Sequence, residues 1–251
     1  MNNFDLKNKF AIITGGAQGF GLDIAKRFIK SGCKVRIWDI DETELQKASK
    51  EINSDKLNYD VVDVSNFTQV KNTVDKIAEN SKIDILVNSA GITGPTSELW
   101  NYKIEDWSKI IDINLNGIFY CCKAVVPFMA KNDYGRIVNI SSVSGMIGNP
   151  GQANYTSSKA GVIAMTKSLA VEWGPYNIRV NAIAPGPFPT EGAWARLSPK
   201  GDLDNDSSYS TIPLGRVGEM SELQNLASFL MADGCDYLTG QTIAIDGAQY
   251  I

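Results

Sequence analysis

The sequence predicts an α/β fold, a doubly wound parallel sheet of seven strands with helices on both faces. Short β-rich runs recur near positions 10, 35, 59, 85, 138, 180 and 243, and runs with helical spacing alternate with them. This alternation is typical of parallel strands joined by right-handed crossovers. The chain has 251 residues, 43% of them hydrophobic, and shows neither a repeat nor an interdomain linker. We therefore expect a single domain over residues 1–251 with a substantial core.

A glycine-rich turn follows the first expected strand, Lys9 to Thr14, and leads into an amphipathic run that begins at Leu22. Glycines at 15, 19 and 21 allow positive φ and a close approach of the backbone to a ligand. The start of the helix offers unpaired N–H groups and a positive dipole end to a pyrophosphate. The spacing is Gly-x-x-x-Gly-x-Gly instead of the commoner Gly-x-Gly-x-x-Gly, and a glycine-rich turn by itself is more often only a turn.

The second expected strand, Lys34 to Asp39, ends in a carboxylate about twenty positions after the glycines, where dinucleotide-binding units place the residue that reads the ribose. We expect Asp39 to accept hydrogen bonds from both adenosine ribose hydroxyls and to repel a phosphate on the 2′ oxygen. The glycine loop contains no lysine or arginine to offset that repulsion. The sequence therefore favours NAD over NADP. Asp39 can also cap the following helix, where Asp41 competes for the same role.

A further buried strand, from Arg136 to Ile140, runs into a loop of small residues that contains Ser142. Ser142 is therefore expected at the carboxyl end of a strand, where open α/β sheets bind their ligands. Its hydroxyl can hold a carbonyl or alcohol oxygen.

Tyr155 and Lys159 are four residues apart in a helical run, so both side chains project from one face. A phenol with a reference pKa of about 10 exchanges protons poorly at neutral pH, and a nearby ammonium favours the phenolate. The pair predicts a tuned acid and base for an alcohol. Taken alone, the same spacing is common on solvated helices.

Together these motifs resemble the short-chain dehydrogenase/reductase family over nearly the whole chain, from Thr14-Gly15 to Ile245-Asp246-Gly247. The resemblance implies a Rossmann-like fold and a catalytic tetrad of Asn114, Ser142, Tyr155 and Lys159. It also implies a chemical role for each: Tyr155 exchanges the proton, Ser142 orients the oxygen, Lys159 binds the nicotinamide ribose, and Asn114 positions a water.

The resemblance further implies a set of cofactor contacts spread over the carboxyl ends of the strands. One motif departs from the family pattern, because Ser89 stands where the Asn-Asn-Ala-Gly turn has its second asparagine, which puts local bracing of the sheet in question. The expected cofactor residues are Gly15, Gln18, Gly19, Phe20, Gly21, Asp39, Asp63, Val64, Asn88, Ala90, Gly91, Tyr155, Lys159, Pro185, Gly186 and Thr190.

Composition excludes several other functions. The chain contains no histidine, which excludes a Ser-His-Asp hydrolase and any histidine-ligated metal centre. The cysteines, at 33, 121, 122 and 235, form neither a zinc pattern nor a disulfide framework, so we expect no metal. A net charge of −4 gives no footprint for nucleic acid. We find no apolar run long enough to span a bilayer and no signal peptide, and we expect a cytoplasmic protein without membrane association.

The segment from Pro187 to Arg216 mixes proline, glycine, serine and aspartate and is too long for a simple connection. We interpret residues 187–216 as a substrate lid, because a merely solvated insertion, the alternative, has no need of Phe188, Trp194 and Leu197. The expected substrate residues are Ser142, Met146, Asn149, Gln152, Tyr155, Phe188 and Trp194.

The expected function is NAD-dependent hydride transfer between a secondary alcohol and a ketone. An alternative is a 3-oxoacyl carrier-protein or CoA reductase using NADPH, against which Asp39 and the lack of a basic docking cluster count. A remote alternative is a dinucleotide-sensing protein without catalysis, which has no need of the tetrad. The sequence does not define the substrate, and sugar or polyol oxidation is equally open.

The family resemblance implies a homotetramer in which the helices containing Asn114 and Tyr155 pack across an interface. Burial within one subunit is the alternative for the apolar residues of these helices. The candidate contacts are Ile110, Ile118, Phe119, Val162 and Leu169.

Overall fold

The computed structural model describes residues 4–190 and 211–250, and its centre is a parallel sheet with strand order β3-β2-β1-β4-β5-β6-β7. All the expected strands are confirmed. The order reverses direction between β1 and β4, and such a reversal opens a crevice at the carboxyl ends of the strands. The strands are β1 (Phe10–Thr14), β2 (Lys34–Asp39), β3 (Leu57–Val61), β4 (Ile85–Asn88), β5 (Gly135–Ile140), β6 (Ile178–Pro185) and β7 (Thr242–Ile245).

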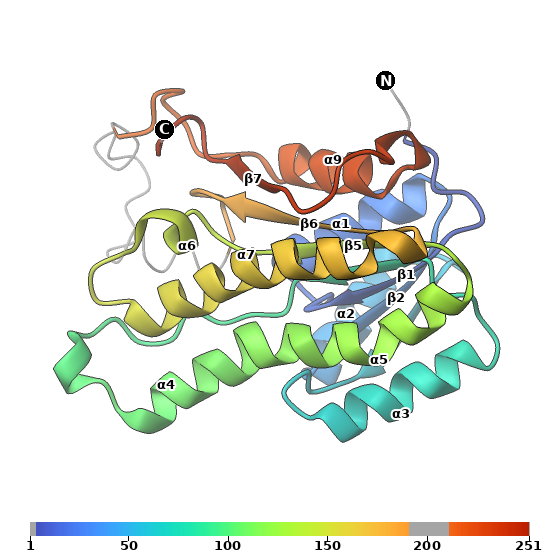
Figure 1. Cartoon of the computed structure of the whole chain (residues 1–251), viewed down its shortest axis with the longest axis horizontal. Coiled ribbons are helices and arrows are strands. Elements are labelled where there is room, and N and C mark those ends of the chain that lie inside the picture. The colour runs from blue at the N-terminus through green and yellow to red at the C-terminus, as the bar shows by residue number, and fades with distance from the viewer. Residues whose placement is uncertain (1–3, 191–210, 251) are drawn as a thin grey trace.

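Helices cover both faces of this sheet (Figure 1), which confirms the doubly wound architecture. The first face carries α1 (Gly19–Lys30), α2 (Glu42–Ile52) and α9 (Met220–Met231). On the second face lie α3 (Phe67–Ala78), α5 (Gly117–Lys131) and α7 (Ala153–Trp173). The shorter elements are α4 (Ile104–Ile111), α6 (Ser144–Ile147), η1 (Leu99–Asn101), η2 (Asp112–Asn116), η3 (Gly174–Tyr176) and η5 (Asp233–Cys235).

Each face of the sheet has its own hydrophobic core, because strands covered on both sides bury alternate side chains in opposite directions. Ile13 and Ile37 point toward α1, whereas Ile12 and Trp38, their neighbours along the strands, belong to the core under α3 and α5. Every residue of β5 is buried. The loop after β5 therefore starts from a strand that is buried along its whole length.

The helical stretch Ile104–Lys131 joins α4 and α5 through one turn of π-helix, η2. Its most apolar window has a mean hydropathy of 1.3, so by length and composition it could cross a membrane, contrary to the expectation from the sequence. Half of that window is buried inside the protein, and α5 packs on α3 while α4 and η2 pack on α7. Burial within the fold accounts for the apolar composition.

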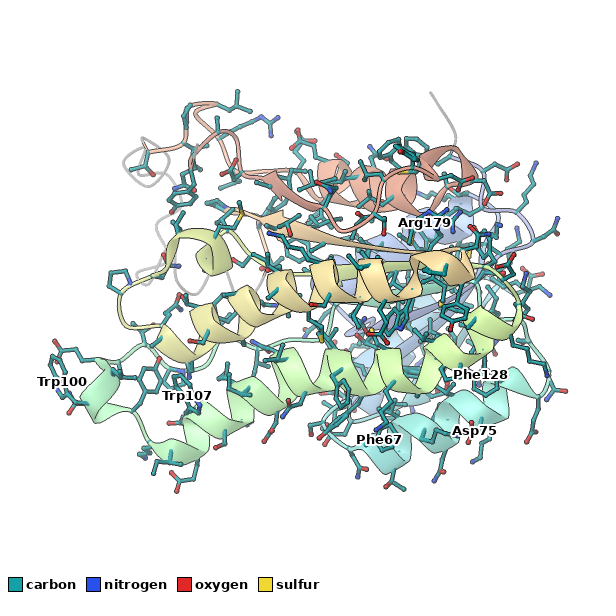
Figure 2. The ribbon with its side chains drawn as sticks, viewed as in Figure 1. Phe67, Asp75, Trp100, Trp107, Phe128 and Arg179 are labelled. Carbon is teal, nitrogen blue, oxygen red and sulfur yellow. The ribbon has the colours of Figure 1, made fainter. Side chains whose placement is uncertain are left out.

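Trp100 projects from the tip of the segment that precedes α4 and is 79% exposed (Figure 2).

Most of the candidate interface residues are core residues of the single chain. Ile110, Ile118 and Val162 are at most 3% exposed, because Ile118 and Val162 pack in the second core and Ile110 packs beside the turn at Gly94. They are therefore not available as contacts between subunits, and this part of the expectation is corrected. Phe119 remains 46% exposed, and Leu169 is partly buried against the second core.

The two ends of the expected lid lie together. The backbone N–H of Gly218 donates to the Pro187 carbonyl at 3.0 Å, and the Leu214 N–H donates to Gly247 at 3.3 Å. The segment therefore leaves and re-enters the fold at one place, above the ends of β6 and β7. The middle of the expected lid, with Trp194 and Leu197, lies outside the described residues.

Candidate active site

The glycine turn after β1 is held by contacts that exclude larger side chains. Gly15 has a φ of +63°, and a Cβ there would lie 2.8 Å from the Ala90 Cα. A Cβ on Gly21 would lie 2.1 Å from the Gly15 carbonyl oxygen, and real Cβ contacts do not approach so closely. These positions require glycine for steric reasons, so the turn can fold tightly against the carboxyl end of β4.

The start of α1, which this turn leads into, is open for an anion. Gln18 occupies the N-cap position in extended conformation and makes no capping hydrogen bond, and the first turn contains no acidic side chain. Its backbone N–H groups therefore face outward without a capping side chain from the protein. A pyrophosphate fits this position, because the amide donors and the dipole of α1 both favour negative charge.

Asp39 ends β2 beside the same turn and is half-buried. Its Oδ2 accepts a long hydrogen bond of 3.3 Å from the Ala17 N–H, and its Oδ1 accepts one of 3.3 Å from Asp41. Asp41, and not Asp39, caps α2 by accepting from the Glu44 N–H at 3.1 Å. The Asp39 carboxylate retains lone pairs for further donors, which fits ribose hydroxyls.

The carboxyl ends of β3 and β4 complete this side of the crevice. Asp63 accepts from both the N–H and the hydroxyl of Ser65, which orders the loop after β3, and Val64 is buried where Gly117 passes. The N–H groups of Ser89 and Ala90 both donate to the Thr14 hydroxyl at 3.1 Å. Thr14 thereby braces the turn that carries Ser89, the residue that departs from the family pattern.

The side chain of Asn88, one of the expected cofactor residues, points into the protein and pairs with a neighbouring strand. It is 1% exposed and donates to the Asn139 Oδ1 at 2.8 Å, and Asn139 donates in turn to Thr166 on α7 at 3.0 Å. Asn88 therefore ties β4 to β5 and, through Asn139, to α7. Any cofactor contact at this position falls to the backbone. The next turn brings Gly91 to the surface of the crevice.

Asn114 lies in the π-helical turn η2 and is fully buried. Its side chain forms two hydrogen bonds of 2.8 Å with Ile92, accepting from the N–H and donating to the carbonyl, and it donates to the Ser158 hydroxyl at 3.2 Å. Ser158 donates to the Tyr155 carbonyl at 2.7 Å. The asparagine thus links the turn after β4 to the helix that carries Tyr155.

Lys159 is 5% exposed, and its Nζ donates to the Ile140 carbonyl at 2.8 Å. The Nζ lies 5.7 Å from the centre of the Tyr155 ring, so the two side chains share one face of α7 as expected. Burial penalises the charged ammonium and lowers the Lys159 pKa to about 8. A Cβ at Gly91 would lie 3.2 Å from the Asn114 Oδ1 and 3.5 Å from the Lys159 Nζ, so these two groups meet beside the Gly91 backbone.

Ser142 follows the end of β5 in the loop that α6 closes. Its hydroxyl oxygen accepts from the Ser144 N–H at 3.1 Å, which leaves its proton to donate to a ligand. The preceding Ser141 donates to the Lys159 carbonyl at 2.9 Å. A Cβ at Gly145 would lie 2.6 Å from the Lys159 carbonyl carbon, so glycine permits α6 to lie directly on α7. These contacts bring the loop of Ser142 onto the helix of Tyr155 and Lys159.

The comparisons with known proteins agree with this geometry. The family model described as Enoyl-(Acyl carrier protein) reductase matches residues 15–248. A 3-oxoacyl-[acyl-carrier-protein] reductase FabG of Chlamydia muridarum is 43% identical over 248 residues, which cover 96% of this chain and 97% of the relative. The chain belongs to the short-chain dehydrogenase/reductase family.

Two further proteins show the range of this likeness. A 2-dehydro-3-deoxy-L-rhamnonate dehydrogenase (NAD(+)) of a Sphingomonas species is 40% identical over 240 residues, which cover 95% of this chain and 94% of the relative. The crystal structure of gox2181 superposes with a TM-score of 0.92 at 36% identity, covering 98% of this chain and 97% of that one. The protein is an oxidoreductase of the short-chain dehydrogenase/reductase type with a Rossmann-like fold.

In this oxidoreductase the end of β6 lies next to the end of β7. Pro185 is buried, its carbonyl accepts from the Val143 N–H at 3.1 Å, and the Gly186 N–H donates to Ile245 at 3.0 Å. A Cβ at Gly186 would lie 2.7 Å from the Asp246 Cβ. The segment is thereby fixed beside the Ser142 loop, and Thr190 follows it at the edge of the described residues.

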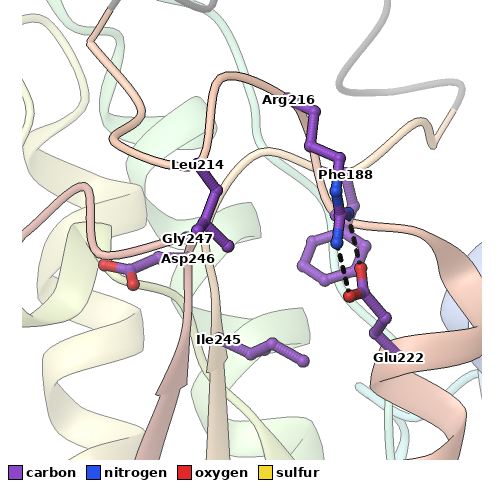
Figure 3. A pocket seen from close by; sticks show the side chains of 8 residues that line it. Phe188, Leu214, Arg216, Glu222, Ile245, Asp246 and Gly247 are labelled. Atoms are coloured by element: carbon purple, nitrogen blue, oxygen red, sulfur yellow. Dashed lines mark hydrogen bonds and ion pairs between the residues drawn. The ribbon is translucent and has the colours of Figure 1, made fainter.

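Phe188 lies in the core and not on a mobile lid. It is 1% exposed, its ring stands edge-on to Phe20 at 5.5 Å, and a Cβ on Gly218 would overlap the ring at 2.4 Å. The expectation that Phe188 closes over the substrate is corrected, because this position links the glycine turn to the first core. Phe188 also forms one wall of a pocket between β7 and α9, where Arg216 and Glu222 form a double hydrogen bond of 2.8 and 2.9 Å (Figure 3).

The other expected substrate residues lie on the segment between Ser142 and Tyr155. Met146 is 51% exposed, and Asn149 is half-buried and donates to the Ser144 hydroxyl at 2.7 Å. Gln152 is only 5% exposed at the start of α7. Met146 and Asn149 are thus accessible to a ligand, whereas Trp194 lies outside the described residues.

All four cysteines are buried and unpaired. Burial raises the pKa of the Cys33 and Cys122 thiols to about 12, and it raises the pKa values of Cys121 and Cys235 as well. Over residues 4–190 and 211–250, no group of three or more His, Cys, Asp or Glu side chains could hold a metal ion.

Several residues that organise this site escaped the sequence analysis. Thr14, Asn139 and Ser158 make the hydrogen bonds that join neighbouring strands and α7, and Asn154 contacts Tyr155 directly. A signal was present for the helix, because Asn154, Ser158 and Thr166 fall on the buried face at multiples of four residues. Polar residues on a buried helix face indicate hydrogen-bonded anchors.

Proposed function

We propose that this oxidoreductase interconverts a secondary alcohol and a ketone, with Tyr155 as the acid and base and NAD as the dinucleotide. The observation that carries the proposal is the convergence of Tyr155, Lys159 and Asn114 at the crevice beside the glycine turn, with Ser142 on the adjoining loop. Burial of the Lys159 ammonium costs free energy, and a protein that only senses dinucleotides does not need a buried lysine beside a phenol.

A nicotinamide dinucleotide, when bound, supplies the carbon that accepts or donates a hydride. In the oxidative direction the Tyr155 phenolate takes the proton of the alcohol, and in the reductive direction the phenol returns it. The Ser142 hydroxyl donates to the same substrate oxygen and fixes its position in both directions. The Lys159 ammonium stabilises the phenolate electrostatically and is oriented by the Ile140 carbonyl.

Asn114 supports this arrangement through hydrogen bonds to the turn after β4 and to α7. Because its side chain is fully engaged with Ile92 and Ser158, it holds the turn after β4 against α7. We propose that the water expected from the family resemblance is positioned by the π-helical turn around Asn114, next to the Lys159 Nζ. Such a water would pass protons between Lys159 and solvent.

The preference for NAD rests on Asp39. Its carboxylate lies at the end of β2 beside Ala17, and among the described residues it accepts two long hydrogen bonds from backbone N–H groups. Ribose hydroxyls can donate to the remaining lone pairs, whereas a 2′-phosphate would meet a like charge. The relative from Sphingomonas, 40% identical, is an NAD(+) dehydrogenase by name.

A second candidate is reduction of 3-oxoacyl thioesters with NADPH, favoured by the 43% identity to the Chlamydia reductase. Against NADPH stands Asp39, and the net charge of −4 gives an acidic carrier protein no general electrostatic attraction. Thioester reduction with NADH is compatible with the same geometry.

The test is steady-state absorbance at the reduced-nicotinamide band. Ethyl acetoacetate and acetoacetyl-CoA are assayed in the reductive direction with NADH and NADPH, and D-gluconate and propan-2-ol in the oxidative direction with NAD and NADP. We expect turnover of at least one probe, with kcat/KM higher for the unphosphorylated dinucleotide. Preference for NADPH with acetoacetyl-CoA would support the second candidate. Tight NADH binding without turnover of any probe would support the sensing protein.

We further propose that the enzyme acts in the cytoplasm as a homotetramer built on α5 and α7. Phe119 and Val171 are exposed apolar residues of these helices, at 46% and 82%. Light scattering after size exclusion tests the assembly, and the single-chain mass of 27.4 kDa would contradict it.

A further inference from the structure

Asn154 immediately precedes the proposed acid and base, Tyr155, in the first turn of α7. The asparagine is 0% exposed, although its neighbour Tyr155 is only partly buried. A fully buried carboxamide needs a reason, because burial of polar groups costs free energy unless their hydrogen bonds are made.

One half of the carboxamide has a partner. The Asn154 Oδ1 accepts from the backbone N–H of Tyr155 at 2.7 Å. This N–H belongs to the first turn of α7, where amides have no carbonyl partner within the helix. Gln152 occupies the N-cap position and makes no capping bond, so Asn154 does from inside the helix what a cap does from outside. The bond fixes the backbone from which the phenol projects.

The other half of the carboxamide has no partner among the described residues. The Asn154 Nδ2 is buried without an acceptor, close to the turn at Gly94, where a Cβ would lie 3.7 Å away. Reversing the amide would direct its NH₂ group at the Tyr155 N–H and would leave two donors facing each other, so the orientation is fixed. The carboxamide is therefore oriented by its acceptor bond to the Tyr155 N–H and not by a partner for its NH₂ group among the described residues.

The same region is held from a second side. Gly94 has a φ of +67°, and a Cβ there would lie 2.7 Å from the Ile110 Cδ1, so the turn presses between α4 and Asn154. Ile92, two residues earlier, is bound on both its N–H and its carbonyl by Asn114. Asn154 therefore has little room to move, and its bond to Tyr155 is rigidly supported.

We propose that Asn154 is a positioning residue, which fixes the Tyr155 phenol in the geometry for proton transfer by accepting the backbone N–H of that residue. The proposal rests on the proposed role of Tyr155. It assigns Asn154 no contact with substrate or dinucleotide. Its loss should therefore lower kcat and leave KM and dinucleotide affinity nearly unchanged.

The kinetic experiment compares four variants with the wild type, using ethyl acetoacetate and NADH. Asn154→Ala removes the acceptor, and we expect kcat to fall about 10-fold to 100-fold, the range for a small misplacement of a catalytic group. Asn154→Asp keeps an acceptor oxygen, and we expect most of kcat to return. KM and the dissociation constant of NADH should stay within about twofold in both.

Two variants separate this result from general damage. Ser228→Ala, on α9, removes the hydrogen bond from a buried hydroxyl to the Gln224 carbonyl and should lower the melting temperature without lowering kcat. Tyr155→Phe sets the floor of activity. An active Tyr155→Phe variant would overturn the proposed function itself. If Tyr155→Phe is inactive and the separate variant Asn154→Ala is fully active, only the role of Asn154 is overturned.

A measurement without substrate completes the test. In protein labelled with ¹⁵N-tyrosine, the amide of Tyr155, assigned with Tyr155→Phe, should be protected from hydrogen exchange in the wild type and in Asn154→Asp. We expect protection to fall at least 10-fold in Asn154→Ala and to persist in Ser228→Ala. Unchanged protection in Asn154→Ala would overturn the proposal even if ethyl acetoacetate were not turned over.

Discussion

The dinucleotide half of the crevice is built from backbone, and the catalytic half is built from side chains. Around the glycine turn, Gly15 and Gly21 are fixed by contacts that no larger residue can satisfy, and the ligand groups are mostly amides. Around Tyr155, the groups are a phenol, an ammonium and a hydroxyl held by a chain of single hydrogen bonds.

The two halves should therefore respond differently to substitution. Where glycine is required, a larger side chain overlaps neighbouring atoms, so substitution should lower both the stability of the fold and the affinity for the dinucleotide. Where single side chains carry the function, a substitution removes one group, so it should lower kcat and leave the dinucleotide affinity unchanged.

Tyr155→Phe should break the catalytic half alone. Without the hydroxyl the proton has no exchange partner, and we expect kcat to fall about 10³-fold, within the range for loss of a general acid or base. The dissociation constant of NADH, measured by calorimetry, should remain within about twofold. If Tyr155→Phe lost NADH binding together with turnover, the separation of the two halves would be contradicted.

Gly21→Ala should break the dinucleotide half. The added Cβ would lie 2.1 Å from the Gly15 oxygen, so the turn has to move, and we expect NADH affinity to fall about 100-fold with a lower melting temperature. Gly174→Ala is the matched control, because no atom lies within 4 Å of its Cβ position. Calorimetry and thermal unfolding of both variants should show a loss in the first alone.

Asp39→Ala tests the side chain to which we assign the preference for NAD. We expect the ratio of NADP to NAD dissociation constants to fall about 10-fold, the effect of removing one like-charge contact. Asp41→Ala, which removes the cap of α2, should lower stability by about 1 kcal/mol and leave that ratio unchanged. An equal shift in both variants would assign the effect to α2.

Lys159→Met should show the smallest effect, in the pH dependence of stability. The folded-state pKa of Lys159 is about 8, below its ordinary value, so below pH 8 the folded state bears the full penalty of a buried charge. Above it only the unfolded state stays charged, and the wild type gains stability until the ordinary value near 10.5 is reached. Between about pH 7 and about pH 9 we expect the wild type to gain about 1 kcal/mol over the variant in urea unfolding. A constant difference would contradict the lowered pKa.

The sequence alone predicted the parts of the molecule that depend on local pattern. The strands were recognisable because buried parallel strands are short apolar runs, and the glycine turn because only glycine fits there. Tyr155 and Lys159 were placed on one face by helical spacing alone, and the structure confirms it.

The parts that depend on distant partners could not be predicted in the same way. Phe188 was interpreted as part of a lid because the surrounding segment is irregular, yet its ring fills the space left by Gly218 and meets Phe20. Ile110 and Val162 have the apolar character of contacts between subunits or of core residues, and only tertiary packing distinguishes the two. Helical spacing placed Asn154 on the buried face of α7, but its bond to the Tyr155 N–H depends on the conformation of the first turn and could not be predicted from that spacing.

Because all four cysteines are buried, their reactivity can be used to measure how often the protein unfolds. No thiol is both accessible and ionised near neutral pH, so a disulfide reagent such as Ellman's should leave the folded enzyme almost untouched. The four cysteines report on three parts of the fold, because Cys33 directly precedes β2, Cys121 and Cys122 are neighbours on α5, and Cys235 lies in η5. The rate of colour development would therefore follow the frequency with which the whole molecule exposes its interior, and a bound dinucleotide that slowed it would be detected without any turnover.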